Sequence, residues 1–366
     1  MLEKKYTSSV YYIIALSFLI RITIPFFFFK DWLTRDSVTY IAQADELLEG
    51  GFGLYFPNGF PSLIAFITLS FGIENREIAL IILNILLSTF SLILFWMLLK
   101  KNIGVNIFSV TALAIFAFYS NQLNYVRYIL TEIPSLFFLL LSVYFLSQKK
   151  LSYSGLVLGI SILIKTSLLP IMILITAYLF YTKKLRAGTT FIVSSFIPVA
   201  IMASYGLIIS GTFTLGLSSV HNFYLSVHQP VLLSDSLISA VSYYLNYALS
   251  NPLIFITERF NSLWEFWGFL PSANEGLREN LVFRLLIGLR FPLLILAIIG
   301  FIKSVKNHLI IFSASAIISI TILHTVFYSI PRYNFTVEPF LILLAVIGFK
   351  YLVDKPEQSK HYGIGI

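Results

Sequence analysis

The chain has 366 residues, of which 58% are hydrophobic and only 11% are charged. Several of its apolar runs approach the roughly 20 residues that a helix needs to cross a bilayer, which excludes an ordinary soluble domain. The absence of cysteine excludes disulfides, Cys-ligated zinc and thiol catalysis. The net charge of +8 is typical of a membrane chain whose lysines and arginines collect in cytoplasmic loops.

Ten apolar runs, bounded by polar clusters, predict an all-α polytopic protein with about ten transmembrane helices in a single membrane domain, residues 1–366. The runs are continuous rather than alternating, so a β-barrel is set aside. Residues 59–73 are apolar but short, and we expect them to lie half-inserted or at the interface. The predicted spans are 10–29, 77–99, 103–120, 129–147, 152–165, 167–182, 188–208, 286–303, 308–328 and 335–353.

The charges orient these spans. Lysine pairs at 100–101, 149–150 and 183–184 fall at one end, which we expect to be cytoplasmic together with both termini. Most acids fall at the other end, where two long segments, 30–76 and 209–285, connect the spans. Because tryptophan and tyrosine favour the headgroup level, these aromatic-rich segments predict interfacial helices on the outer face.

Asp36 follows the first span and opens a stretch, Asp36 to Leu48, with apolar residues at helical spacing and a stop at Gly50. The helix N-terminus favours an ionised carboxylate, because free N–H groups and the helix dipole point toward it. A carboxylate just above the bilayer can also accept a proton from a hydroxyl. Two interpretations stay open here, a helix N-cap or a general base.

Glu132 is a second acid at the outer face, near the start of the span 129–147. Two carboxylates from separate segments can act as base and orienting partner, or can bind a divalent cation. Glu132 can also cap its own helix or pair with Arg127. His221 and His228 lack a carboxylate at metal-ligand spacing, so no histidine metal site is predicted.

Five cations also fall at the outer level, against the usual inward bias of positive charge, and they indicate an anionic ligand such as a lipid phosphate. Any one of them can instead extend to lipid headgroups. Arg21, inside the first span, is expected to point into the helix bundle. The five outer cations are Lys30, Lys165, Arg284, Arg290 and Arg332.

Several segments resemble, in order, the GT-C glycosyltransferases, which include protein O-mannosyltransferases and the aminoarabinose transferases of lipid A. The resemblance covers most of 10–182 and 324–353. It departs from the family at Ser37, where a second acid is common, and at Phe56-Pro57-Asn58-Gly59. The segments are Asp36-Ser37-Val38-Thr39-Tyr40, the stretch 55–65, Leu130-Thr131-Glu132-Ile133-Pro134, Gly155-Leu156-Val157-Leu158-Gly159 with Lys165, and Arg332-Tyr333 with Pro339.

The resemblance implies an inverting hexosyl- or pentosyltransferase at the extracytoplasmic face of the plasma membrane. It implies a polyprenyl-phosphate sugar donor and a lipid, glycan or protein acceptor, with Asp36 as general base and Glu132 as a second acidic residue. Lys165 and Arg332 match further family positions, and with Arg290 they are expected to bind the donor phosphate. No cofactor is required, and a divalent cation is left open.

Two alternatives are kept. One is a polysaccharide polymerase or ligase that uses a lipid-diphosphate donor, and the other is a lipid or solute transporter. A transporter is disfavoured because polar residues gather at the outer end rather than at the midplane, and no matching repeats are evident. No nucleotide-binding motif is present, so no nucleic-acid partner is predicted. Segment 209–285 matches no part of the family, and we expect it to bind the acceptor and determine which acceptor is used.

Overall fold

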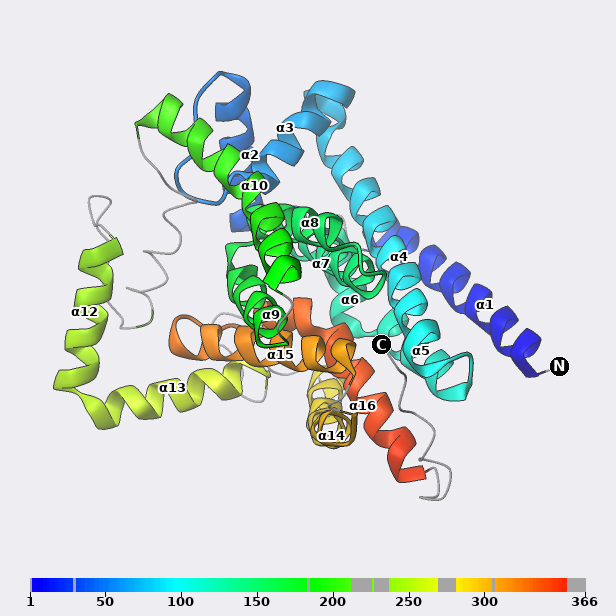
Figure 1. Ribbon diagram of the computed structural model, residues 1–366. Coiled ribbons are helices and arrows are strands. Elements are labelled where there is room, and N and C mark those ends of the chain that lie inside the picture. The colour runs from blue at the N-terminus through cyan, green and yellow to red at the C-terminus, as the bar shows by residue number, and fades with distance from the viewer. Residues whose placement is uncertain are drawn as a thin grey trace.

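The computed structural model describes residues 2–28, 31–182, 185–211, 226, 237–268, 281–304 and 307–353. Within these ranges all regular secondary structure is helical (Figure 1). Five helical segments are long and apolar enough to cross a membrane: Tyr6–Phe28, Ile73–Ile103, Leu185–Ser210, Leu309–Val326 and Pro331–Val353. By helix length and composition the chain is therefore an α-helical membrane protein, as the sequence predicts.

The count of ten spans is wrong for the described residues. Four predicted spans are short apolar helices, and a helix of 16 residues is only about 24 Å long, less than the roughly 30 Å of hydrocarbon in a bilayer. Their apolar character has another cause, since apolar runs of this length are typical of core helices. The four are α5 (Ile107–Phe118), α7 (Glu132–Ser147), α8 (Leu151–Ile164) and the segment Thr166–Tyr181.

The remaining predicted span, 286–303, falls within α14 (Leu281–Ser304), whose side chains are described from Arg290 onward. Lys30, His221 and His228 lie outside the described residues, as does the side chain of Arg284.

The other elements are α1 (Leu2–Thr23), η1 (Ile24–Phe28), α2 (Arg35–Leu48), α3 (Gly59–Phe71), η2 (Ile73–Asn75), α4 (Arg76–Ile103), α6 (Ser120–Asn124), η3 (Tyr125–Arg127), η4 (Thr166–Leu168), α9 (Leu169–Tyr181), α10 (Leu185–Ser210), α12 (Leu237–Ser250), α13 (Pro252–Phe266), α15 (His308–Val326), η5 (Pro331–Val337) and α16 (Glu338–Val353).

Helices α7 and α8 form the centre of the bundle, packed against each other and flanked by α4 and α10 (Figure 1). Small residues bring some helices very close, as is common in membranes. A Cβ atom on Gly348 of α16 would lie 1.9 Å from the carbonyl oxygen of Leu296 in α14, so this helix pair requires glycine. Arg21 is fully buried and donates to Ser88 and to the carbonyl of Ala117, which confirms that it points into the bundle.

The two long segments contribute helices of their own. In 30–76, α2 and α3 pack against each other. In the described part of 209–285, α12 and α13 are helical as predicted, and they project from one side of the bundle (Figure 1). Leu249 of α12 and Leu253 of α13 are 79% and 80% exposed, and the interfacial position of these helices stays a prediction.

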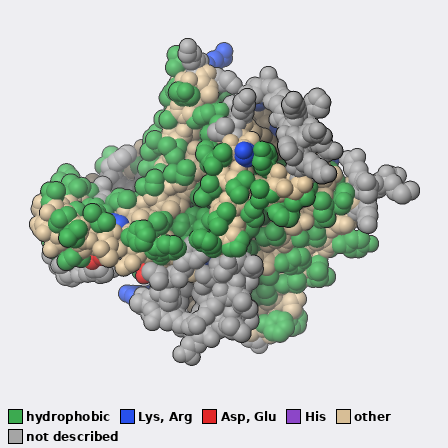
Figure 2. All heavy atoms as spheres, turned by 90° about the horizontal axis from the view of Figure 1, so that it is seen from below, with side chains coloured by type: hydrophobic (Ala, Val, Ile, Leu, Met, Phe, Trp, Pro, Cys, Tyr) green, Lys and Arg blue, Asp and Glu red, His purple; other side chains and the backbone are tan. Residues whose placement is uncertain are grey.

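The described surface is largely apolar. In Figure 2, hydrophobic side chains cover much of the face that is shown, and charged side chains are few. Large exposed apolar residues occur on several helices, among them Tyr12 of α1, Leu69 of α3 and Ile208 of α10. Such side chains are stable against lipid tails, whereas in water a patch of this extent would drive association.

One end of the bundle collects lysines. Lys101, at the end of α4, donates to the carbonyl of Ser147 at the end of α7. Lys303, at the end of α14, lies 4.8 Å from the ring centre of Tyr351, and Lys350 lies 6.0 Å from that of Phe108. Of the lysines predicted at the cytoplasmic ends, these three therefore lie at the same end of the bundle.

Candidate functional site

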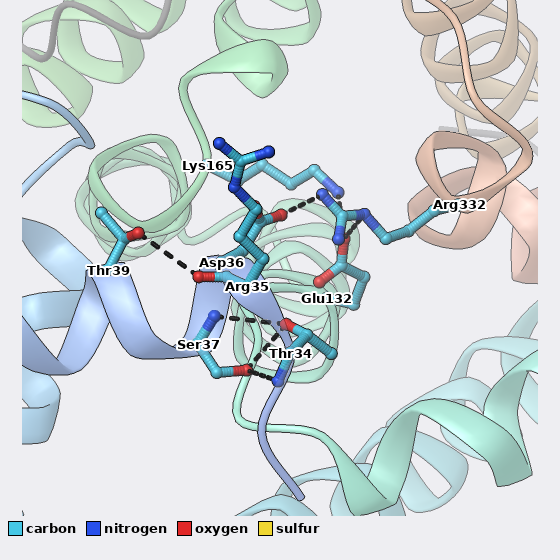
Figure 3. Close-up of polar contacts among 8 residues, drawn as sticks. All are labelled: Thr34, Arg35, Asp36, Ser37, Thr39, Glu132, Lys165 and Arg332. Atoms are coloured by element: carbon cyan, nitrogen blue, oxygen red, sulfur yellow. Dashed lines mark hydrogen bonds and ion pairs between the residues drawn. The ribbon is translucent and has the colours of Figure 1, made fainter. Parts of the chain in front are cut away.

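At the end of α7 opposite these lysines, four of the five predicted site residues meet (Figure 3). Nη2 of Arg332 donates to Oδ2 of Asp36 at 2.6 Å. Nε of Arg332 lies 3.3 Å from Oε1 of Glu132, and Nζ of Lys165 donates to the same oxygen at 3.3 Å. Two carboxylates and two cations, separated by up to 296 positions in the sequence, thus form one cluster.

Asp36 lies in the first turn of α2 but does not cap it. The N-cap is Thr34, whose hydroxyl accepts from the backbone N–H of Ser37, while the Ser37 hydroxyl accepts from the N–H of Thr34. The N-cap interpretation of Asp36 is therefore wrong. Because a reciprocal capping box already serves the free backbone donors, the Asp36 carboxylate is available to face Arg332.

Glu132 is the first residue of α7 and is 2% exposed. Arg127, the alternative partner considered from sequence, donates to Asn124 and to Tyr128 instead. Burying a carboxylate is costly unless cations compensate it. Lys165 and Arg332 compensate the charge of Glu132, and Glu132 in turn fixes the positions of both cations.

Lys165 lies where the chain reverses between α8 and η4. Its backbone is extended, with φ −145° and ψ 96°, and this ends α8 at Ile164. The start of α3 packs against the same turn, because a Cβ on Gly59 would lie 2.4 Å from the backbone carbonyl carbon of Leu163. The close contact brings the 30–76 segment directly against the Lys165 turn.

Tyrosines surround the charged cluster, and sequence reasoning gave them no role. Tyr40 is buried one turn after Asp36 and stacks on Phe56 with ring centres 4.2 Å apart. Burial, followed by the nearby Glu132 charge, raises the pKa of Tyr40 above its usual range, so its phenol stays neutral. The pKa of the more exposed Tyr55 is also raised, first by burial and then by Asp36. Tyr40 lies at i+4 from Asp36, a spacing that could have indicated a shared helix face.

The four charged side chains differ in access to solvent. The side chain of Asp36 is 31% exposed and that of Arg332 is 21% exposed, against 9% for Lys165 and 2% for Glu132. Of these, only Asp36 is both acidic and accessible. The arrangement can therefore present a carboxylate to an incoming hydroxyl, with a guanidinium beside it to bind an anion.

Arg290, the fifth predicted site residue, has its partners in another cluster. It donates to the carbonyl of Trp267 at 3.0 Å and to the Tyr119 hydroxyl at 3.1 Å, and it pairs with Glu338 at 3.5 Å. Glu338 also accepts from Asn121 and Gln122. This network joins α6, α14 and α16, so the structure does not bring Arg290 together with the other four predicted site residues.

No group of three or more His, Asp or Glu side chains with metal-binding geometry occurs among the described residues. Asp36 and Glu132 both face Arg332, so a divalent cation at this place would compete with the guanidinium for the carboxylates. No protein-family model matches the chain, and no curated protein matches it either.

Proposed function

We propose that the protein is a membrane glycosyltransferase that moves a sugar from a polyprenyl-phosphate donor to an acceptor hydroxyl, with inversion at the anomeric carbon. The observation that carries this proposal is the meeting of a partly exposed carboxylate, Asp36, and a partly exposed guanidinium, Arg332, with the buried Glu132 and Lys165 at one end of an apolar bundle. An outer-level base beside cations suits a substrate with a lipid tail and a phosphate. The residues that carry the resemblance to GT-C enzymes point the same way.

In the proposed reaction, the acceptor oxygen attacks the anomeric carbon from the side opposite the phosphate, and Asp36 takes the hydroxyl proton. The bond between the anomeric carbon and the phosphate oxygen breaks, and its electron pair leaves with the lipid phosphate. A general base at this position contributes about 10²–10⁴ to the rate. The sugar-phosphate bond itself supplies the driving energy.

Arg332 is the residue best placed to bind the leaving phosphate. A guanidinium has five N–H donors in a planar fork, and only part of them face Asp36 and Glu132. The ammonium of Lys165, which donates to Glu132, adds a second positive charge near the guanidinium. Cations ordered in advance stabilise the charge that develops on the phosphate without having to reorganise during the reaction.

The proposal places this site on the extracytoplasmic face of the plasma membrane in a multi-pass protein. Support comes from the lysines at the opposite end of α7 and α16, because positive charge collects on the cytoplasmic side. Tritium- or fluorescence-labelled acceptor supplied to one side of oriented vesicles tests the side. If the acceptor is glycosylated only when it is supplied on the cytoplasmic side, the proposed orientation is wrong.

Purified protein in liposomes, supplied with polyprenyl-phosphate sugars and candidate acceptors, tests the function. Mass spectrometry should show consumption of a lipid-monophosphate sugar and a product heavier by one sugar residue. Consumption of a lipid diphosphate would favour the polymerase or ligase alternative. Counter-flow of substrate without a covalent product would favour the transporter and would overturn the proposal.

Arg332→Lys is expected to weaken binding of the donor about tenfold. Lysine keeps the positive charge, but a single ammonium cannot contact Asp36, Glu132 and a phosphate in the way that the planar guanidinium can. The measurement is the Kd for a polyprenyl phosphate. Arg76→Lys is the matched control, because Arg76 also pairs with an α2 aspartate, Asp45, at 2.5 Å. If both changes raise the Kd equally, Arg332 does not bind the phosphate.

Removal of divalent cations is expected to leave the transfer rate unchanged. The two carboxylates at the site already have cationic partners, so the charge that a metal would supply is present in the chain. The rate should be measured after dialysis against EDTA and again after addition of Mg²⁺ or Mn²⁺. A loss with EDTA that either ion restores would show that the transfer needs a metal.

A further inference from the structure

Five buried polar atoms without hydrogen-bond partners lie in η4, in α15, which contacts η4, and directly after α15. They are Oγ of Ser167 in η4, Oγ1 of Thr321, Nε2 of His324 and Oγ1 of Thr325 in α15, and Oγ of Ser329. A buried polar atom without a hydrogen-bond partner destabilises the fold, because it has lost its bonds to water and gained none in return. Five in one region of a membrane protein indicate a place that a polar ligand completes.

The two threonines differ from three other threonines in the described helices. Thr68, Thr89 and Thr176 each donate to the carbonyl four residues earlier, which satisfies a hydroxyl inside an apolar bundle. Thr321 and Thr325 are also in a helix, yet their buried hydroxyls make no such bond. Both hydroxyls are therefore available to bond with another group.

His324 connects this group to the charged cluster. Its ring stacks on Tyr333 with centres 4.2 Å apart, and Nζ of Lys165 lies 5.5 Å from the centre of the same tyrosine ring. The imidazole also stacks on the ring of Phe266, with ring centres 5.8 Å apart. A single aromatic ring, that of Tyr333, therefore separates His324 from Lys165, one of the cations proposed to bind the phosphate.

The protonation of His324 follows from its partner. Nδ1 lies 3.1 Å from the carbonyl oxygen of Tyr328, which can only accept, so Nδ1 carries the proton. His324 is buried, with 7% of its residue surface exposed. A second proton would place a buried imidazolium close to Lys165. Nε2 is therefore a lone-pair acceptor that needs a donor from outside.

We propose that Ser167, Thr321, His324, Thr325 and Ser329 form the subsite that binds the sugar of the donor, and that this sugar is neutral. The inference rests on the proposed function and adds the substrate class. Hydroxyl side chains both donate and accept, and Nε2 accepts, which matches the hydroxyls of a pyranose or furanose ring. A uronic acid does not fit, because its carboxylate would face the lone pair of His324.

The test compares binding of farnesyl phosphate with binding of its mannose, glucose, galactose and glucuronic acid conjugates to the purified full-length protein. Wild-type protein should bind at least one neutral conjugate about tenfold or more tightly than farnesyl phosphate, and the glucuronate no better. The double variant Thr321→Val, Thr325→Val and the variant His324→Phe should lose that preference. Their affinity for farnesyl phosphate should stay within about twofold of wild type.

Thr176→Val is the matched control, because the Thr176 hydroxyl is bonded within its own helix, and it should keep the sugar preference. Thermal unfolding without ligand supplies a second reading. Replacing an unsatisfied hydroxyl by a methyl group should leave the melting temperature of the double variant equal or higher. A lower melting temperature, or retention of the wild-type preference by the variants, overturns the subsite.

The two proposals fail in different ways. If wild-type protein prefers no sugar conjugate, the subsite is rejected even when transfer is observed. If sugar preference is present and depends on His324, while no donor supports transfer, the subsite stands and the proposed transferase activity is rejected.

Discussion

Replacement of Asp36 by Asn is expected to lower the rate of sugar transfer by about 10²–10⁴-fold. Asparagine has nearly the same shape, and its oxygen can still accept from Arg332, but it cannot take a proton from the acceptor hydroxyl. Thermal stability should stay near that of the wild type, because Thr34 and Ser37 cap α2 without help from Asp36. Initial rates at saturating donor, with the melting temperature of the same samples, provide the measurement.

Asp45→Asn is the matched control for this change. Asp45 lies on the same helix, is paired with an arginine at 2.5 Å and has a side chain that is 39% exposed, against 31% for Asp36. It shares the charge, the helix and the kind of partner, but not the cluster with Glu132. Transfer should survive in Asp45→Asn. Activity that persists in Asp36→Asn would show that another group accepts the proton.

Replacement of Glu132 by Ala is expected to have the largest effect on stability, a loss of about 3–5 kcal/mol. Glu132 is 2% exposed and compensates Lys165, which is itself buried. Its removal leaves the Lys165 ammonium without its carboxylate in an apolar surrounding. The free energy of unfolding, measured in detergent with a reversible denaturant, and the transfer rate should both fall.

A double replacement separates these two effects. In Glu132→Leu with Lys165→Met, the carboxylate and the ammonium are removed together, and apolar groups of similar volume often replace a buried pair without loss of stability. Stability should therefore recover toward that of the wild type. Transfer should stay low, since Arg332 would lose one anchor and the phosphate one cation. Recovery of both would mean that the pair serves folding alone.

Local patterning was sufficient for the features that depend on neighbours in sequence. The apolar runs predict the helical membrane class, the stretch 36–48 predicts α2, and the lysine pattern predicts the shared end at which Lys101, Lys303 and Lys350 lie. These signals are local because a helix repeats every 3.6 residues and its hydrogen bonds stay within the segment. The predicted number of spans was wrong for the same reason. An apolar run such as 152–165 has the same sequence pattern whether it contacts lipid or other helices.

The sequence by itself also selected Asp36, Glu132, Lys165 and Arg332 as outer-end charges, but only the tertiary structure decided which of them meet. It paired Glu132 with Lys165 and Arg332 instead of Arg127, and it placed Arg290 with Glu338. The physical reason is that ion pairing in an apolar bundle depends on burial and on distances of a few ångströms. These quantities arise only when helices distant in sequence pack together, whereas charge type and helix end can be read along the chain.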